Sequence, residues 1–239
     1  QNLINIENDD KVKAFLVTQN LKDEEYINNH YVIMSTKKGQ VKKTLLEQYS
    51  RQRTNGVQAI TIKDGDELLE AKLTNGSSQV MLAVKSGKTI RFEEEKTRPM
   101  GRTASGVRGI SLADEKDEVI GMIAVDDMES EILVVSEKGY GKRSKLEDYR
   151  ITNRGGKGVK TLNVSEKTGA LVSIKNVTDE DDLMIINKSG ITIRMEVDQL
   201  RTMGRATQGV RLININDNDA IAAVAKVMKD DEEVGEEEI

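Results

Sequence analysis

The chain has 239 residues, a formal net charge of −5, no cysteine and only 3% aromatic residues. The lack of cysteine excludes disulfides, thiolate catalysis and cysteine-ligated zinc, and it favours a reducing cytoplasm. The longest apolar runs have four to six residues. Because a bilayer-spanning helix needs roughly 20, we expect a soluble protein without a membrane partner.

A period of about 50 residues runs through the sequence. Two glycine series mark it, one following an apolar run and the other preceding a valine. Successive members are 48, 52 and 51 residues apart in the first series and 50, 52 and 51 apart in the second. Two landmarks with one period indicate four repeated units. The first series is Gly39, Gly87, Gly139 and Gly190, and the second is Gly56, Gly106, Gly158 and Gly209.

Each unit begins with a predicted β-hairpin. In the first unit the apolar residues 31–34 lead through Gly39 into the basic residues 41–43. A glycine supplies the positive φ of a tight hairpin turn, so we assign the first glycine series a structural role. The same pattern recurs at 80–84 with 89–92, at 132–135 with 140–143, and at 183–186 with 191–194.

An arginine-containing loop follows each hairpin and ends at the Gly-Val pair. The first loop is two residues shorter than the others, so we expect its basic patch to sit differently. Loop glycines let backbone amides approach a phosphate, or they only permit a bend between strands. The loops are residues 51–56, 98–106, 150–158 and 201–209.

Apolar and polar residues alternate after each Gly-Val pair, which predicts a half-buried strand, and a mostly acidic turn follows. These segments are 60–62, 110–112, 162–164 and 212–215. Residues 3–6 carry the same pattern, so the chain is expected to begin inside a repeat. We expect residues 1–228 to form one repeat domain of about four blades and the acidic residues 229–239 to form a disordered tail. The tail either competes with DNA or only aids solubility.

Units of this length with about four strands each predict an all-β, propeller-like fold, here as a partial array. A β-solenoid is the structural alternative, although its rungs are usually shorter. Neither architecture needs the aromatic core that this composition lacks.

Positive charge follows the repeat. Windows 37–58, 85–108, 138–160 and 188–211 hold 26 of the 36 Lys and Arg residues but only 8 of the 41 Asp and Glu residues. Units arranged around an axis would join these windows into one band, which suits the phosphates of double-stranded DNA. The fourfold recurrence supports DNA binding. Any single lysine, taken alone, fits a merely solvated surface equally well. The predicted DNA-binding residues are Lys38, Lys42, Lys43, Arg51, Arg53, Lys88, Arg91, Arg98, Arg102, Arg108, Lys138, Lys142, Arg143, Lys145, Arg150, Arg154, Lys157, Lys160, Lys188, Arg194, Arg201, Arg205 and Arg211.

No catalytic residue, metal site or cofactor is predicted. The single histidine, His30, lies in a polar stretch typical of a loop, and a Ser-His-Asp or multi-histidine site lacks partners. No glycine-rich stretch leads into a helix with the Lys-Ser or Lys-Thr of a nucleotide-phosphate loop. The carboxylates cluster in turns, which favours solvated turns over acid-base pairs.

Several phrases resemble the C-terminal domain of bacterial DNA gyrase A, within an array from residue 3 to about 228. The resemblance implies a β-pinwheel, a propeller-like ring whose rim wraps DNA during negative supercoiling. It implies the remainder of gyrase A and the gyrase B protein as partners, with the catalytic tyrosine and ATP hydrolysis outside this chain. The phrases are Lys42-Lys43-Thr44, Asp64-Gly65-Asp66-Glu67-Leu68, Arg98-Pro99-Met100-Gly101-Arg102 with Gly106-Val107-Arg108-Gly109-Ile110, Gly139-Tyr140-Gly141-Lys142-Arg143, and Gly204-Arg205 with Gln208-Gly209-Val210.

The sequence departs from that family in one motif. The box Gln-Arg-Arg-Gly-Gly-Lys/Arg-Gly of the family's first blade is absent, and the similar residues 153–158 lie in the third loop. The family usually has six blades, so about two are expected to be missing on the N-terminal side, which leaves full wrapping by this fragment open. The related C-terminal domain of topoisomerase IV and a protein-interaction scaffold are the alternatives. Salt-dependent binding of a duplex would argue against the scaffold.

Overall fold

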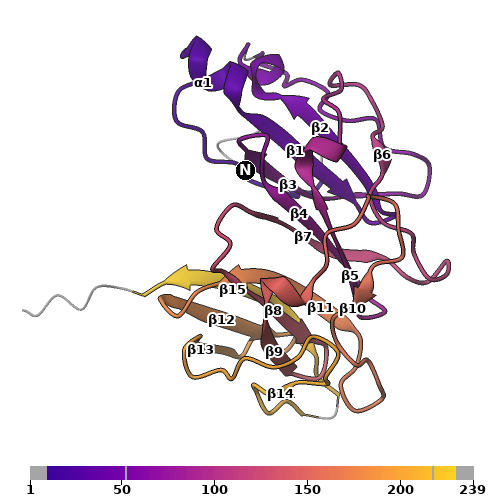
Figure 1. Ribbon diagram of the computed structural model, residues 1–239, viewed down its shortest axis with the longest axis vertical. Coiled ribbons are helices and arrows are strands. Elements are labelled where there is room, and N and C mark those ends of the chain that lie inside the picture. Colours follow the sequence, from indigo (N-terminus) through magenta and orange to yellow (C-terminus); the bar gives the residue numbers. More distant parts are fainter. Residues whose placement is uncertain (1–9, 52, 217, 230–239) are drawn as a thin grey trace, which may run out of the picture.

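The computed structural model describes residues 10–51, 53–216 and 218–229. Within these residues the chain forms fifteen β-strands, one short α-helix and three short 3-10 helices. The strands make four antiparallel sheets, which we call blades 1 to 4 in chain order (Figure 1). The predicted all-β, propeller-like fold is confirmed. The predictions for residues 3–6 and for the acidic residues 230–239 lie outside the described residues.

Blades 1 to 3 have four strands each, and blade 4 has three among the described residues. Blade 1 has the order β3-β1-β2-β6, blade 2 β10-β5-β4-β7, blade 3 β11-β8-β9-β14 and blade 4 β13-β12-β15. The strands are β1 Tyr31–Thr36, β2 Gln40–Leu45, β3 Leu68–Thr74, β4 Gln79–Val84, β5 Lys88–Glu93, β6 Val107–Arg108, β7 Val119–Val125, β8 Glu131–Ser136, β9 Tyr140–Lys145, β10 Val159–Lys160, β11 Leu171–Val177, β12 Asp181–Asn187, β13 Thr192–Glu196, β14 Val210–Arg211 and β15 Ile221–Met228.

The four predicted hairpins are confirmed as β1-β2, β4-β5, β8-β9 and β12-β13. Their turn glycines have φ between +76° and +87°. A residue with a Cβ adopts this region only with strain, so glycine is required at the turn. The 3-10 helices Leu46–Tyr49, Glu94–Lys96 and Leu146–Asp148 follow the first three hairpins directly.

The prediction of a strand in the alternating segment after each Gly-Val pair is wrong. Residues 60–62, 110–112 and 162–164 have no regular strand, and neither does 212–215. The backbone of the first three segments bonds the loop of the next unit. For example, the Ser111 amide donates to the Gly156 carbonyl at 2.9 Å. The strand lies beyond the acidic turn, as β3, β7, β11 and β15.

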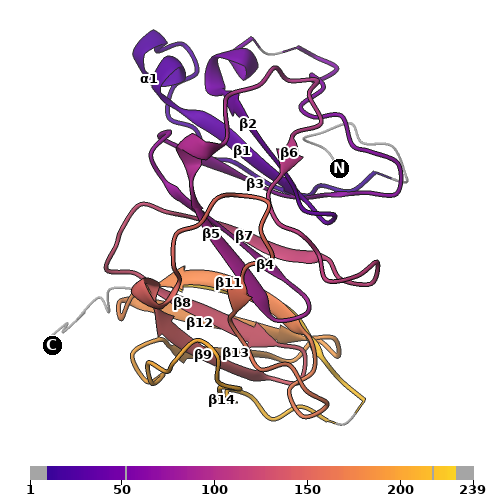
Figure 2. The same cartoon turned by 45° about the vertical axis from the view of Figure 1, so that its right-hand side comes forward.

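These four inner strands contact one another in chain order, β3 with β7, β7 with β11 and β11 with β15. The blades therefore succeed one another along the molecule (Figures 1 and 2). Apolar cores fill the interfaces: Leu82 and Phe92 belong to the core that also contains Ile33 of blade 1. Met81 and Val134 share the next core. Each blade thus buries its sheet face against its neighbours, as stacked repeats must.

The opposite edge of blades 1 to 3 is an outer strand donated by the following unit. β6 pairs with β2, β10 with β5 and β14 with β9. A Cβ on Gly106 would lie 2.6 Å from the Val41 carbonyl oxygen, and one on Gly158 would lie 2.7 Å from that of Thr89. The Gly-Val glycines are therefore needed for close approach of two strands. Gly56 differs, because a Cβ there would meet no atom of the described residues within 4 Å.

The α-helix Glu24–Asn29 lies against blade 1. Asp23 caps it, since its side chain accepts a hydrogen bond from the Tyr26 amide at 3.1 Å. Ile27 buries its side chain in the apolar cluster with Val32 and Leu46. His30 ends the helix with its Nδ1 2.8 Å from the Tyr26 carbonyl oxygen. A helix-terminal role thus accounts for the single histidine.

Candidate nucleic-acid interface

The outer strands carry one exposed cation each, at the same register position. Arg108 lies opposite Gln40, Lys160 opposite Lys88, and Arg211 opposite Tyr140. All three cationic side chains are exposed. We call the edge formed by β6, β10, β14 and loops 98–106, 150–158 and 201–209 the rim.

The loops are chained along the rim by one arginine each, four residues before the Gly-Val glycine. Arg102 donates to the carbonyl oxygen of Gln58 at 3.5 Å. Arg154 donates to that of Arg108 at 3.1 Å, and Arg205 to that of Lys160 at 2.7 Å. Each accepting carbonyl lies two residues beyond the Gly-Val glycine of the preceding unit. Equivalent loops therefore occupy equivalent places, which aligns their cations along one edge.

Two of the predicted DNA-binding lysines are buried beneath these loops. The Lys42 ammonium donates to the carbonyl oxygens of Ala59, at 2.5 Å, and Arg102. The Lys142 ammonium donates to the Gly204 carbonyl oxygen at 2.6 Å and to the Thr207 hydroxyl at 3.1 Å. Burial, with a smaller contribution from Arg102 for Lys42, lowers the pKa of each lysine to about 8. These side chains hold loops in place and do not face solvent.

A second recurrent basic position, four residues after the turn glycine, connects successive blades. Lys43 pairs with the buried Glu94 carboxylate at 2.9 Å. Arg91 donates to the carbonyl oxygens of Leu146 at 2.7 Å and Tyr149 at 2.9 Å. Arg143, the equivalent residue of blade 3, contacts blade 4 in the same way. In blades 1 to 3 the basic side chain at this position therefore contacts the next blade.

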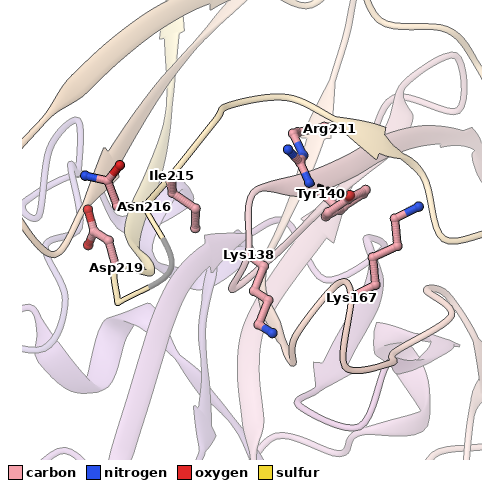
Figure 3. A pocket seen from close by; sticks show the side chains of 7 residues that line it. All are labelled: Lys138, Tyr140, Lys167, Arg211, Ile215, Asn216 and Asp219. Carbon is pink, nitrogen blue, oxygen red and sulfur yellow. Dashed lines mark hydrogen bonds between the residues drawn. The ribbon is translucent and has the colours of Figure 1, made fainter.

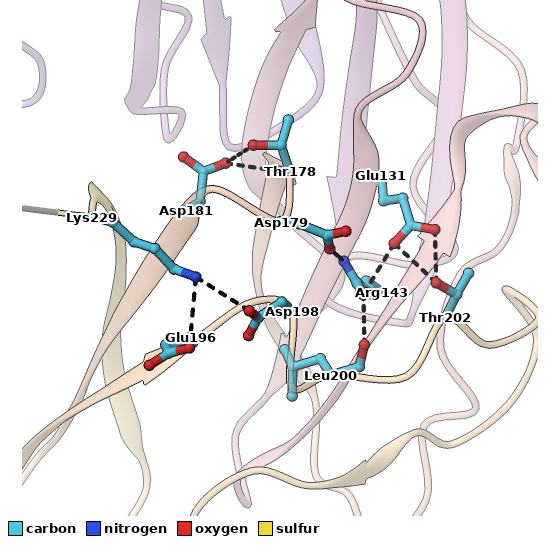
Figure 4. A network of polar contacts seen from close by, with 10 residues as sticks. All are labelled: Glu131, Arg143, Thr178, Asp179, Asp181, Glu196, Asp198, Leu200, Thr202 and Lys229. Atoms are coloured by element: carbon cyan, nitrogen blue, oxygen red, sulfur yellow. Dashed lines mark hydrogen bonds and ion pairs between the residues drawn. The ribbon is translucent and has the colours of Figure 1, made fainter. Parts of the chain in front are cut away.

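Arg143 lies at the centre of a polar network between blades 3 and 4 (Figure 4). Its guanidinium donates to the Leu200 carbonyl oxygen at 2.6 Å, lies 3.1 Å from a Glu131 carboxylate oxygen and also pairs with Asp179. Glu131 in turn accepts from the Thr202 hydroxyl at 2.8 Å. Acidic groups thus surround Arg143, which leaves little of its charge for an added phosphate.

The 23 predicted residues therefore fall into three groups of different accessibility. The exposed ones are Lys38, Arg51, Arg53, Arg98, Arg108, Lys138, Lys145, Arg150, Lys157, Lys160, Lys188, Arg194, Arg201 and Arg211. The half-buried ones are Lys88, Arg102, Arg143, Arg154 and Arg205, and the buried ones are Lys42, Lys43, Arg91 and Lys142.

The first loop joins this edge through a neighbour. Arg51 and Arg53 line a recess of about 430 Å³ together with Arg102 of the second loop. Gln48 helps to hold the two loops together, because its side chain accepts from the Arg102 amide at 3.1 Å. The short first loop thus adds its two arginines beside the second loop's arginine.

The acidic turns fix the hairpins. Asp66 accepts from the Lys38 amide at 2.9 Å, Asp117 from the Ser86 amide at 2.9 Å and Asp219 from the Ser189 amide at 3.3 Å. In blade 3 the Thr168 carbonyl oxygen takes this role, accepting from the Lys138 amide at 3.0 Å. A backbone carbonyl thus stands in blade 3 where the other turns use a carboxylate. Sequence reasoning missed the exposed Lys167 beside this turn, because it concentrated on the basic windows.

The described ranges 10–51, 53–216 and 218–229 contain no group of three or more His, Cys, Asp or Glu side chains arranged to hold a metal ion. They also contain no helix with the length and apolar character needed to cross a membrane.

A protein-family comparison agrees with this repeat geometry. A family model described as "DNA gyrase C-terminal domain, beta-propeller" matches residues 30–75, 79–126, 130–178 and 181–228. The chain belongs to this family. The matched segments begin close to β1, β4, β8 and β12, so each contains one hairpin and the inner strand after it. As a gyrase C-terminal domain, the chain contains four such repeats in the matched range.

Curated relatives include the DNA gyrase A protein of Staphylococcus aureus strain MRSA252. It is 42% identical over 238 residues, which cover 99% of this chain and 26% of the relative. The DNA gyrase A protein of Staphylococcus epidermidis strain ATCC 12228 is 42% identical over 232 residues, covering 97% of this chain and 25% of the relative. The chain thus spans about a quarter of the length of these relatives.

Solved structures share the fold. A DNA gyrase A C-terminal domain superposes with a TM-score of 0.82 at 23% identity, covering 95% of this chain and 74% of that one. A C-terminal domain of DNA topoisomerase IV superposes with a TM-score of 0.79 at 25% identity, covering 84% and 62%.

Proposed function

We propose that this gyrase C-terminal domain binds duplex DNA along its rim and wraps it as part of negative supercoiling. The observation that carries the proposal is the alignment of Arg108, Lys160 and Arg211 on successive outer strands, with the loops chained between them. Cations repeated once per blade on one edge match a phosphate backbone, which presents charge at regular intervals.

The exposed cations are the proposed phosphate contacts, together with the half-buried loop arginines. Their head groups neutralise phosphates and release counterions, so affinity falls steeply with salt and depends little on sequence. Bending a duplex of roughly 20 to 30 base pairs costs on the order of 1 to 6 kcal/mol, which several such contacts together offset. Lys42, Lys43, Arg91 and Lys142 support the loops and blades from beneath. Reversing the charge of Lys142 or Arg143 is therefore expected to disturb folding as well as binding.

The first prediction concerns the rim cations. Replacing Arg108, Lys160 and Arg211 together by glutamine should weaken binding of a 30-base-pair duplex. The slope of log K against log salt should fall by about three, because each lost phosphate contact removes about one. A mobility-shift titration at several potassium chloride concentrations measures both quantities.

The matched control replaces three lysines outside the basic windows, Lys11, Lys22 and Lys226, all of which are exposed. It removes the same charge but should change the slope by much less than three. Equal slopes for the two variants would refute a localised rim interface.

We also propose that this chain is not itself catalytic and that strand cleavage and ATP hydrolysis belong to the remainder of gyrase A and to gyrase B. The relatives are about four times as long as the match, which leaves room for such parts. The corresponding compartment is the cytoplasm, where a bacterial chromosome lies.

The second candidate function is that of a topoisomerase IV C-terminal domain, favoured by the TM-score of 0.79 with which such a domain superposes on this chain. The two enzymes catalyse different reactions. A holoenzyme containing this domain that introduces negative supercoils into relaxed plasmid supports gyrase, whereas one that only relaxes and decatenates supports topoisomerase IV.

A further inference from the structure

Blade 3 has a recess on its rim. It has a volume of about 260 Å³ and is lined by Lys138, Tyr140, Lys167 and Arg211 on one side and by Asn216 and Asp219 on the other (Figure 3). Arg211 belongs to the outer strand β14 and Tyr140 to β9, so paired strands form its floor. The recess therefore opens where the proposed duplex runs.

Tyr140 organises the cations of this recess. Its ring centroid lies 5.3 Å from the Arg211 guanidinium carbon and 5.5 Å from the Lys167 ammonium. Its hydroxyl accepts a hydrogen bond from Arg211 at 3.0 Å. Among the described residues nothing accepts the hydroxyl hydrogen, so the phenol keeps a free donor beside two cations.

Among the described residues that line the recess, hydrogen-bond donors outnumber the free acceptors. Lys138 donates one hydrogen bond to the Glu166 carbonyl oxygen at 2.5 Å, and its ammonium has two further hydrogens. In the described ranges neither Lys138, Lys167 nor Arg211 forms an ion pair. The lining carboxylate, Asp219, already accepts from the Ser189 hydroxyl at 2.7 Å and from the Ala220 amide at 2.8 Å.

The other blades differ at these positions. Tyr140 corresponds to Gln40 in blade 1 and to Lys88 in blade 2, and the turns of both blades carry a capping aspartate, Asp66 and Asp117. Blade 3 replaces that aspartate by Thr168. Blade 3 thus combines three cations and a phenol with a turn that is capped by a carbonyl oxygen.

We propose that this recess binds a single phosphate group and that in the working domain the phosphate belongs to the DNA backbone. This inference rests on the proposed function. Ammonium, guanidinium and phenol donors all line the recess, and the charge-assisted hydrogen bonds that such groups donate to a phosphate are roughly twice as strong as neutral ones. Blade 3 then holds the duplex more firmly than its neighbours.

The test uses the whole chain and two variants, Lys167→Ala and Tyr140→Phe. Lys167→Ala should weaken duplex binding and lower the salt slope by about one. Tyr140→Phe removes a hydrogen bond but no charge, so binding should weaken about tenfold with the slope unchanged. The control is Lys116→Ala, an exposed lysine in the turn of blade 2 beside the capping Asp117, which should change affinity and slope less.

A second arm uses inorganic phosphate and pyrophosphate with thermal unfolding, since a ligand of the native state raises Tm. Both anions should raise the Tm of the wild-type chain and of Lys116→Ala but not that of Lys167→Ala. If the wild-type chain binds the duplex while both recess variants behave like the control, the recess is refuted and the proposed function stands. If no duplex binds but pyrophosphate still distinguishes Lys167→Ala, the proposed function fails, and the inference that the phosphate is DNA's is overturned with it.

Discussion

At the scale of single residues, lysine and arginine serve two physical purposes in this domain. On the outer strands they are exposed and are the proposed phosphate contacts. Lys42 and Lys142 instead donate from beneath the surface to loop carbonyl oxygens and hold the loops in place. The equivalent positions in blades 2 and 4 hold Ile90 and Ile193. An apolar side chain therefore fits the same place when no loop carbonyl needs a donor.

Lys142→Ile tests the cost of the buried charge. The folded-state pKa of about 8 lies below the usual value of 10.5, so between these values the unfolded chain binds more protons and stability rises with pH. Below pH 8 both states are protonated and this gain is absent. Urea unfolding of the wild-type chain at pH 7.5 and pH 9.5 should show the rise, and the variant should show a smaller one. An identical pH dependence of the wild-type chain and the variant would contradict the lowered pKa of Lys142.

The Lys43–Glu94 ion pair makes another residue-scale prediction. Glu94→Leu introduces the residue found at the equivalent positions Leu46 and Leu146, but it leaves Lys43 buried without its partner. We expect a loss of about 3 kcal/mol or more in unfolding free energy, as for other broken buried pairs. The double variant Lys43→Met with Glu94→Leu should recover most of that loss in urea denaturation. Additive losses would show that the two charges act independently.

At the scale of elements, a strand from the next unit completes each of the first three blades. The exchange depends on glycine, because the two backbones approach too closely for a Cβ. The first three segments after Gly-Val donate backbone hydrogen bonds to the loop of the following unit, so they pair with that loop and form no regular strand.

Gly158→Ala should therefore destabilise the domain more than Gly56→Ala. Both glycines have nearly the same φ, +68° and +69°, so both variants include the left-handed strain of about 1 to 2 kcal/mol. Gly158→Ala adds a Cβ 2.7 Å from a carbonyl oxygen, whereas the Cβ of Gly56→Ala meets no atom of the described residues within 4 Å. Comparing the two unfolding free energies isolates the cost of the contact, and equal losses would mean that β10 shifts freely.

At the scale of the whole molecule, opposite charges are separated between the rim and the rest of the chain. The net charge of −5 includes seven acidic residues within 230–239. Their removal makes the net charge positive, and long-range repulsion of DNA should fall accordingly.

A chain ending at residue 229 is therefore expected to bind a duplex more tightly at low salt, with the difference vanishing as salt screens the charges. Circular dichroism checks that the fold is retained, and the mobility-shift titration measures affinity. Weaker binding after truncation would show that the acidic residues support the interface.

The sequence by itself determined the period, the hairpins and the segregation of charge. These features are local: a turn glycine, an apolar run and the next basic run lie within about fifteen residues, and their spacing specifies them. The same local reasoning misplaced the fourth strand, because alternation reports burial of Ile110 and Leu162 without saying which backbone they bond.

Only the tertiary structure decided which cations face solvent and which loop completes which blade. Lys142 meets its acceptor in Gly204 across 62 residues, and Arg91 reaches Tyr149 across 58. Contacts of that range depend on how one blade stacks on the next, and residue spacing within a unit contains no information about them. The recess around Tyr140 has the same origin, because it arises where the outer strand of one unit lies against the hairpin of another.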